Sequence, residues 1–288
     1  PVVPGDWVLV ADAVVVAVLP RTSLLRRRDP TTEAEQLLAA NVDVVAVVCG
    51  LDRPVRHGRI ARTAAMAWDA GATPLVVLTK TDLVDDADAI AERVEAENPG
   101  VDVLTLSAPE GQGLDDLAAH VRDRTVVLVG ESGAGKSTLT NALAGTDVAA
   151  VGEVRAGDAK GRHTTTTREL HLLASGGVLV DSPGIRAVGL VSDADAVAAT
   201  FADVEDLAEM CRFTDCGHTN EPGCAVTDAI RSGQLDPARL ASWRALRREA
   251  EAAAVRADAV ERRRRGKQFS KMVREVKEHK GRPPDERP

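Results

Sequence analysis

The sequence predicts an α/β fold in which helices cover both faces of a parallel β-sheet. From residue 41 onward, short apolar runs that suit buried strands alternate with amphipathic helical segments, the pattern of parallel strands joined by crossover helices. A glycine-rich loop follows one of these strands and opens a helix, as in phosphate-binding α/β proteins. After about residue 193 the strand pattern ends and mainly helical segments remain. With 288 residues, 44% of them hydrophobic, the chain can form about two domains with a buried core.

The individual elements can be placed in order along the chain. The first thirty residues contain two short strands, at 5–10 and 13–19, followed by a basic stretch at 21–28. Two strands do not form a stable domain alone, so these either extend a neighbouring sheet or belong to a larger barrel. Later strands are expected at residues 42–49, 74–79, 101–107, 125–130, 169–173 and 178–180. Helices are expected at residues 59–70, 87–97, 114–121 and 240–265.

The composition argues against several classes of protein. Aromatic residues make up only 2% of the chain, which argues against a protein that grips nucleic acid by stacking bases on aromatic side chains. The longest apolar run, at residues 13–19, is far shorter than the roughly 20 residues of a membrane-spanning helix. No secretory leader is visible, so we expect a cytoplasmic protein without membrane contact.

Charge is unevenly distributed along the chain. The net charge is −8, yet residues 262–282 carry ten Lys or Arg against two Glu, so this segment is +8 and the rest is −16. A basic arm on an acidic body suits one localised contact with a polyanion. A solvated terminal helix would have the same composition, so charge alone leaves both interpretations open.

The strongest motif is the glycine-rich sequence GESGAGKST, which fits the phosphate-binding pattern G-x-x-x-x-G-K-[ST]. Its glycines let backbone amides converge on phosphate oxygens at a helix N-terminus. Lys136 is expected to reach the β- and γ-phosphates as a catalytic residue, and the Ser137 hydroxyl to bind Mg²⁺. The candidate nucleotide-binding residues here are Gly130, Glu131, Ser132, Gly133, Ala134, Gly135, Lys136, Ser137 and Thr138.

Two further segments predict which base is bound. The sequence TKTD follows the strand at 74–79 and comprises Thr79, Lys80, Thr81 and Asp82. A carboxylate at Asp82 can accept hydrogen bonds from N1–H and the exocyclic amine of guanine, which adenine cannot offer, while the Lys80 stem lies along the base. Ser107 and Ala108 follow the next strand, where a backbone N–H can reach guanine O6. Each motif is weak alone, and their combination favours GTP and GDP as ligands.

Residues after the glycine-rich loop suit the γ-phosphate and Mg²⁺. Asp181 can hold Mg²⁺ through water and the Gly184 amide can contact the γ-phosphate. A Thr-rich loop precedes them, and we favour Thr165 or Thr166 as a hydroxyl that completes the Mg²⁺ shell. His163 lies beside these threonines, and a neutral imidazole there can orient or deprotonate the attacking water.

Three of the four cysteines cluster near the C-terminal end. The spacing C-x4-C-x-H-x5-C comprises Cys211, Cys216, His218 and Cys224. Three thiolates and one imidazole fill a tetrahedral shell, so one structural Zn²⁺ is expected. Cys49 lies alone in an apolar run and is expected in a core.

Together these motifs resemble a GTPase whose elements are circularly permuted, because the guanine-reading segments precede the phosphate-binding loop. With the Cys/His cluster, the chain resembles the ribosome small-subunit-dependent GTPases of the RsgA or YjeQ type. The resemblance implies GTP hydrolysis stimulated by the small ribosomal subunit, in late assembly of that subunit, with binding to its rRNA. It also implies the zinc module, whose spacing is the same.

The resemblance has two departures. Members of the family carry a complete OB barrel before the GTPase, whereas about thirty residues precede it here, which puts barrel-mediated RNA contact in doubt. Thr79 stands where the commonest GTPase pattern has Asn, so fewer ties between loops and a lower affinity for the base are expected.

The expected organisation has three parts in a monomeric protein. They are a partial OB-like β element at 1–30, a permuted GTPase domain at 31–192, and a helical zinc module with a basic C-terminal arm at 193–288. Two rival functions stay open from the residues themselves. One is a nucleotide-gated RNA-binding module with incidental hydrolysis, and the other is a P-loop ATPase or kinase with a zinc appendage.

Overall fold

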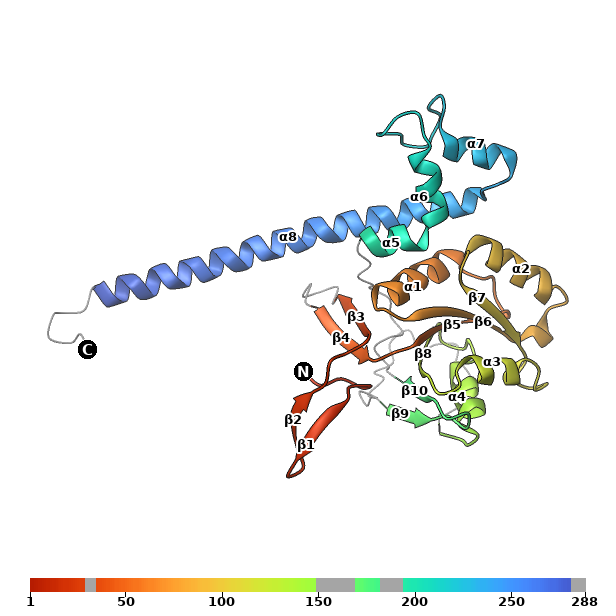
Figure 1. Cartoon of the computed structure of the whole chain (residues 1–288), viewed down its shortest axis with the longest axis horizontal. Helices are drawn as coiled ribbons and strands as arrows, with labels where there is room; N and C mark the ends of the chain where they lie inside the picture. Colours follow the sequence, from red (N-terminus) through yellow and green to blue (C-terminus); the bar gives the residue numbers. More distant parts are fainter. Residues whose placement is uncertain (29–34, 149–168, 182–193, 281–288) are drawn as a thin grey trace, which may run out of the picture.

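The computed structural model describes residues 1–28, 35–148, 169–181 and 194–280. Its centre is a six-stranded sheet in the order β7-β6-β5-β8-β10-β9 (Figure 1). All neighbours are parallel except the edge strand β9, which is antiparallel to β10. The predicted parallel sheet is thus confirmed, apart from this edge. The strands are β5 (Val44–Gly50), β6 (Thr73–Thr79), β7 (Asp102–Leu106), β8 (Thr125–Gly130), β9 (Glu169–Leu172) and β10 (Val178–Asp181).

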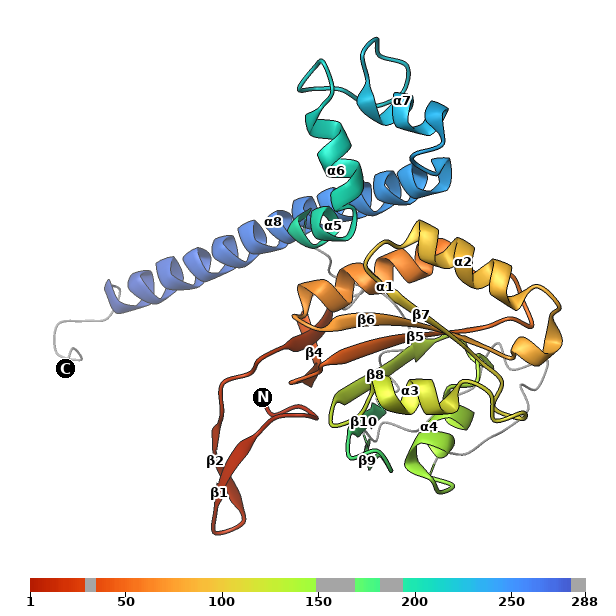
Figure 2. The same cartoon turned by 45° about the vertical axis from the view of Figure 1, so that its right-hand side comes forward.

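Helices cover both faces of this sheet, as predicted (Figure 2). α1 (His57–Asp69) and α2 (Ala87–Glu97) lie on one face, and α3 (Leu114–His120) and α4 (Lys136–Ala144) lie on the other. Because successive side chains of a strand point to opposite faces, the Val-rich strand β5 contributes to the core on both sides of the sheet.

The parallel arrangement places the carboxyl ends of five strands at one edge of the sheet. β5, β6, β7, β8 and β10 all run in the same direction. Ligands of open α/β sheets bind outside this edge. The segments predicted to bind nucleotide follow β6, β7, β8 and β10, so the fold gathers their starting points at a single edge.

The N-terminal strands form a hairpin that projects from the body (Figure 1). β1 (Val8–Ala11) pairs antiparallel with β2 (Val14–Val18), and most of its large apolar side chains are exposed. This pair matches the two strands expected near the N-terminus.

A second antiparallel pair was not predicted. β3 (Leu24–Arg28) lies inside the segment interpreted as a basic stretch, and it pairs with β4 (Glu35–Ala40). Leu25 and Leu38 are buried against Met66 of α1, so burial of two leucines outweighs the polar character of the surrounding residues. The predicted limit at residue 30 falls between these paired strands, and the domain limits stay a prediction.

The C-terminal part packs on α1. It comprises α5 (Ala194–Thr200), α6 (Ala202–Glu209), α7 (Ala225–Ser232) and α8 (Pro237–Lys280). Phe201, Trp243 and Leu246 share a buried cluster with Ala61 of α1. α8 is much longer than the helix expected at 240–265 and extends beyond the body (Figure 1). Across the described ranges, none of the helices combines the length and apolar character that crossing a membrane requires.

Candidate functional site

The glycine-rich loop connects β8 to α4 at the carboxyl edge of the sheet. Glu131, Ser132, Gly133, Ala134 and Gly135 form the loop, and Lys136, Ser137 and Thr138 form the first turn of α4. Gly135 has φ +91°, a left-handed conformation that favours glycine. Lys136 Nζ donates to the carbonyls of Gly130, at 2.8 Å, and Glu131. The ammonium is therefore held over the loop, in front of a helix N-terminus that attracts anions.

The predicted guanine-reading residues come together beside this loop. Lys80 is left-handed, with φ +62°, and leads into a 3₁₀ turn, η1 (Thr81–Leu83), that holds Asp82. Ser107, which follows β7 and precedes Ala108, donates from its hydroxyl to Asp82 Oδ1 at 2.6 Å. The two segments that were weak separately are thus joined by a direct hydrogen bond.

Thr79 connects the guanine-reading segment to the phosphate-binding loop. It is 3% exposed, and its Oγ1 donates to the carbonyl of Ala134 at 2.7 Å, with the Cys49 carbonyl at 3.4 Å. A tie between loops was expected to be weakened where Thr replaces Asn. The hydroxyl nevertheless makes one, because β6 brings it next to the loop that follows β8.

Sequence reasoning missed a group of arginines on the segment that follows β5. Arg53, Arg56 and Arg59 each place a guanidinium nitrogen 2.7–3.6 Å from the carboxylate of Glu131. Arg53 also donates to the carbonyl of Ser132 at 3.3 Å. The spacing of these arginines after a strand was the available signal, but their common partner is distant in sequence.

Several predicted residues lie outside the described part of the chain. They are His163, Thr165, Thr166 and Gly184. β10 ends at Asp181 on the same edge as the glycine-rich loop, but the side chain of Asp181 is not described. The roles expected for these five residues stay predictions.

The Cys/His cluster lies between α6 and α7, in the C-terminal part. One ligand atom from each of Cys211, Cys216, His218 and Cys224 lies within 4.8 Å of the others. Cys211 Sγ and Cys224 Sγ are 3.8 Å apart, and each is 3.6 Å from His218 Nδ1. A tetrahedral site with Zn–S bonds of about 2.3 Å has sulfur–sulfur edges of about 3.8 Å. These four residues therefore fit a tetrahedral metal ion.

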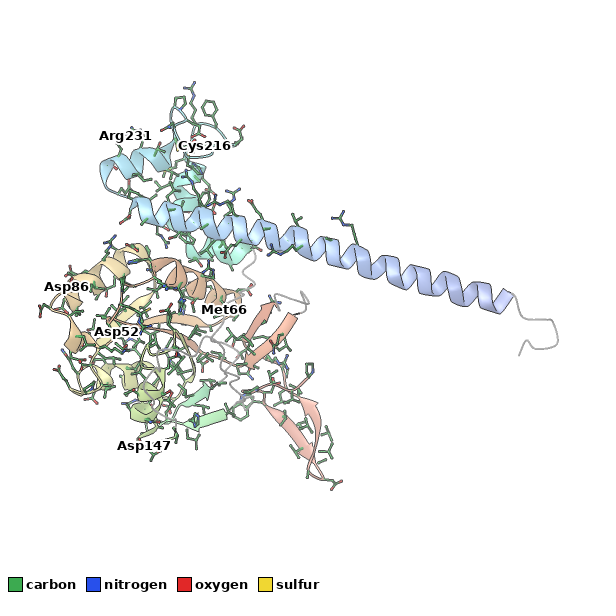
Figure 3. All side chains as sticks on the ribbon, turned by 180° about the vertical axis from the view of Figure 1, so that it is seen from behind. Asp52, Met66, Asp86, Asp147, Cys216 and Arg231 are labelled. Atoms are coloured by element: carbon green, nitrogen blue, oxygen red, sulfur yellow. The ribbon has the colours of Figure 1, made fainter. Side chains whose placement is uncertain are left out.

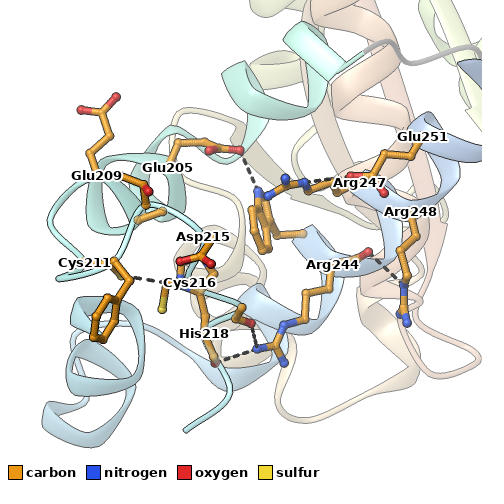
Figure 4. A pocket seen from close by; sticks show the side chains of 15 residues that line it. Glu205, Glu209, Cys211, Asp215, Cys216, His218, Arg244, Arg247, Arg248 and Glu251 are labelled. Carbon is orange, nitrogen blue, oxygen red and sulfur yellow. Dashed lines mark hydrogen bonds and ion pairs between the residues drawn. The ribbon is translucent and has the colours of Figure 1, made fainter. Parts of the chain in front are cut away.

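Neighbouring groups hold the cluster in shape. Arg244 of α8 donates to the carbonyls of Gly217 and His218 (Figure 4), and the backbone at His218 is left-handed, with φ +57°. Backbone amides, its own and those of Thr219 and Gly217, lower the pKa of the Glu221 carboxyl to about 2. The carboxylate thereby ties together the loop that carries the histidine.

The surroundings of the Cys224 sulfur favour its thiolate form. Burial alone raises the pKa of this thiol, but hydrogen bonds from Thr227, together with those to His218 and Cys216, outweigh it and lower the pKa to about 6. Cys224 also begins α7 as its N-cap residue, where the helix dipole favours negative charge. By contrast, Cys49 is half-buried against one of the core clusters, and burial raises the pKa of its thiol to about 11.

Comparison with known proteins agrees with this arrangement. The chain is 49% identical to the "Small ribosomal subunit biogenesis GTPase RsgA" of Streptomyces coelicolor, over 88% of this chain and 72% of the relative. It superposes with a TM-score of 0.60 on YjeQ from Thermotoga maritima, at 25% identity, covering 82% of this chain and 78% of that structure.

YloQ, whose structure is described as a circularly permuted GTPase, gives the same TM-score of 0.60 at 24% identity, covering 86% of this chain and 80% of that one. This likeness supports the permuted fold. The sequence model of the RsgA GTPase family matches residues 18–191. The chain therefore belongs to the RsgA family of GTPases.

Proposed function

We propose that this GTPase acts in biogenesis of the small ribosomal subunit, hydrolysing GTP to GDP and phosphate at the carboxyl edge of its sheet. The observation that carries the proposal is the pairing of Asp82 with Ser107 beside the glycine-rich loop. The carboxylate proposed to read guanine is oriented by this bond, at the same edge of the sheet as the glycine-rich loop. Such a carboxylate would not favour ATP, because adenine has neither the N1–H nor the 2-amino group from which the carboxylate accepts hydrogen bonds in guanine.

Each end of the nucleotide has its own set of residues in this proposal. Asp82 binds the base edge, the stem of Lys80 lies along the base, and the backbone of Ala108 lies near O6. The amides of the glycine-rich loop surround the phosphates, and Lys136 stabilises the charge that develops on the transferring group.

Magnesium would be held by the Ser137 hydroxyl and by further oxygens from the predicted residues Asp181 and Thr165 or Thr166. When bound, Mg²⁺ neutralises charge on the β- and γ-phosphates. The Gly184 amide contacts the γ-phosphate, and His163 orients the attacking water. A neutral imidazole suits that role because its ordinary pKa lies near neutral pH.

The small subunit and its rRNA are the proposed partners, contacted by a monomer in the cytoplasm. The relative from Streptomyces coelicolor is named for small ribosomal subunit biogenesis. Residues 262–282 carry ten Lys or Arg against two Glu, and most of this segment belongs to the far end of α8. We expect this end of the helix to contact rRNA phosphates at a distance from the GTPase sheet.

The metal of the Cys/His cluster is proposed to be one structural Zn²⁺. Three thiolates and an imidazole are the ligands that zinc prefers, and a four-ligand shell leaves no open position for substrate. Bound zinc would fix the loop between α6 and α7 and thereby the shape of the C-terminal part.

The proposal is tested by comparing hydrolysis of GTP and ATP by the parent protein and by Lys136→Ala. We expect turnover of GTP only, reduced to below about 1% in the variant. Arg122→Ala is a matched control, because it removes an exposed cation that precedes β8 at the opposite edge of the sheet. Equal turnover of ATP, or a Lys136→Ala rate within twofold of the parent, would overturn the GTPase site.

Binding to rRNA is tested separately with a chain truncated after Val260. Phosphate contacts release counterions, so removing the basic arm should weaken binding to small subunits and flatten its dependence on salt. An unchanged salt slope would exclude the arm as the rRNA contact. Subunit binding without stimulated hydrolysis would favour the nucleotide-gated RNA-binding module instead.

A further inference from the structure

A carboxylate outside the predicted motifs lies between the two ends of the nucleotide site. Asp52 belongs to the segment between β5 and α1, at the carboxyl edge of the sheet (Figure 3). Its Oδ2 accepts hydrogen bonds from Lys80 Nζ at 2.9 Å and from Arg53 Nη2 at 2.8 Å. Lys80 is the residue whose stem is expected to lie along guanine.

The packing at this point leaves no spare room. A Cβ added at Gly50, the last residue of β5, would lie 2.6 Å from Asp52 Oδ1, 3.4 Å from Ala134 Cα and 3.5 Å from Lys80 Cδ. A contact of 2.6 Å is too short for a real Cβ, so any larger residue at this position would displace the Asp52 carboxylate. The segment after β5, the guanine-reading segment and the phosphate-binding loop therefore meet at a single position.

Arg53 extends the same network to the phosphate-binding loop. Besides its bond to Asp52, it donates to the Ser132 carbonyl at 3.3 Å and lies 3.6 Å from the Glu131 carboxylate. Asp52 is thus bonded to Lys80 of the base-reading segment and, through Arg53, connected to the phosphate-binding loop.

The charges suit a carboxylate that stays ionised. Hydrogen bonding to Arg53 and then to Lys80 lowers the pKa of Asp52 to about 2. At neutral pH one anion is shared by two cations, which limits its repulsion of the nucleotide phosphates. Asp52 and Lys80 are both partly exposed, so solvent weakens their attraction. The main effect of the ion pair is therefore to hold the Lys80 side chain in one position, rather than to stabilise the fold.

We propose that Asp52 is a positioning residue for the nucleotide, which holds the Lys80 stem along the face of the guanine base and, through Arg53, fixes the base-reading segment relative to the phosphate-binding loop. This inference rests on the proposed GTP site. Because Lys80 belongs to the proposed base-reading segment and Lys136 is the residue proposed to act on the transferring phosphoryl group, Asp52 is expected to affect how tightly nucleotide is held rather than the chemical step. It touches neither substrate nor reacting atoms.

The test uses Asp52→Asn, which keeps the shape of the side chain and removes its charge. We expect GDP dissociation and the KM for GTP to rise about fivefold to tenfold, as for loss of one charge-assisted hydrogen bond. The kcat should stay within about twofold of the parent. Asp86→Asn is the matched control, since Asp86 is exposed at the N-terminus of α2 and makes no capping bond with its side chain.

A double-mutant cycle separates positioning from a merely structural role. If Asp52 acts through Lys80, the pair Asp52→Asn and Lys80→Met should bind GDP no more weakly than Lys80→Met alone. Fully additive losses, or an Asp52→Asn protein whose KM and GDP dissociation match the parent, would overturn the inference while leaving GTP hydrolysis intact. A parent protein that neither binds nor hydrolyses GTP would instead overturn the proposed function.

Discussion

The hydroxyl of Ser107 donates to the carboxylate of Asp82 at 2.6 Å, across two segments that lie 25 residues apart. Parallel pairing of β6 with β7 brings these residues together, because the carboxyl ends of both strands are at one edge of the sheet. The bond fixes one carboxylate oxygen and thereby the direction in which the group faces a base.

Replacement of Asp82 by Asn should exchange guanine for xanthine as the preferred base. An amide can donate to the 2-oxo group of xanthine, but it repels the exocyclic amine of guanine. We expect the preference for GTP over XTP to fall by at least about a hundredfold, measured as kcat/KM for both nucleotides. Ser107→Ala, which leaves the carboxylate in place, should give a smaller loss without exchanging the preference. Undiminished selectivity for GTP over XTP in Asp82→Asn would show that Asp82 does not contact the base.

Replacement of Cys216 by Ser should release the metal and loosen the C-terminal part, since a four-ligand site contributes its binding energy to folding. Elemental analysis of the purified variant should find less than one zinc per chain, while GDP binding is retained. Cys49→Ala is the control, because Cys49 lies in β5 and outside the cluster. Stoichiometric zinc in the Cys216 variant would show that this sulfur is not a required ligand.

Replacement of Arg239 by Met should detach the C-terminal part from α2. The side chain is 3% exposed and donates to the carbonyls of Glu97 and Thr200 and to the Asp203 carboxylate. Loss of these bonds leaves buried acceptors without a donor, so we expect the free energy of unfolding to fall by about 2–3 kcal/mol. Denaturant titration measures this change.

The matched control for Arg239 is Arg231→Ala. Arg231 pairs with Asp228 on the surface, where both side chains are largely exposed, and removal of such a pair should change stability by less than about 0.5 kcal/mol. Similar losses of unfolding free energy in Arg239→Met and Arg231→Ala would show that the buried bonds of Arg239 do not hold the C-terminal part on α2.

The predicted elements correspond well to the structure where the pattern is local. The helix expected at 87–97 has those bounds in the structure, because a polar face and an apolar face alternate through its whole length. The strands at 74–79 and 125–130 are correct within one residue, since Val-rich runs bounded by glycine or threonine suit buried parallel strands.

What sequence reasoning missed depends on distant partners. β3 carries three arginines, Arg26, Arg27 and Arg28, and its pairing with β4 could not be seen in a basic stretch. The contacts of Asp52 with Lys80, and of three arginines with Glu131, join segments that only the sheet order brings together. The nucleotide motifs were accessible because each follows a strand, whereas the residues that hold them in place were not.

Replacement of His163 by Ala should slow subunit-stimulated hydrolysis by about a hundredfold, a typical contribution of a positioned acid–base group, while GTP affinity is retained. Ile185 occupies the position after Gly184 where Ras-like enzymes orient water with Gln, so another polar side chain is needed. His120→Ala is the control, because His120 is a partly exposed histidine whose ring contacts the carbonyl of Asp116 in its own helix. Equal stimulated rates in parent and His163→Ala would exclude His163 from orienting water.

The central claim is tested most directly by measuring GTP turnover by the unmodified chain, with and without purified small ribosomal subunits. Because Ile185 cannot orient water, the chain alone should be a slow hydrolase, and saturating small subunits should raise kcat for GTP at least about tenfold. ATP turnover should stay undetectable in both states. A GTP rate that small subunits leave unchanged, or that large subunits raise equally, would contradict the account.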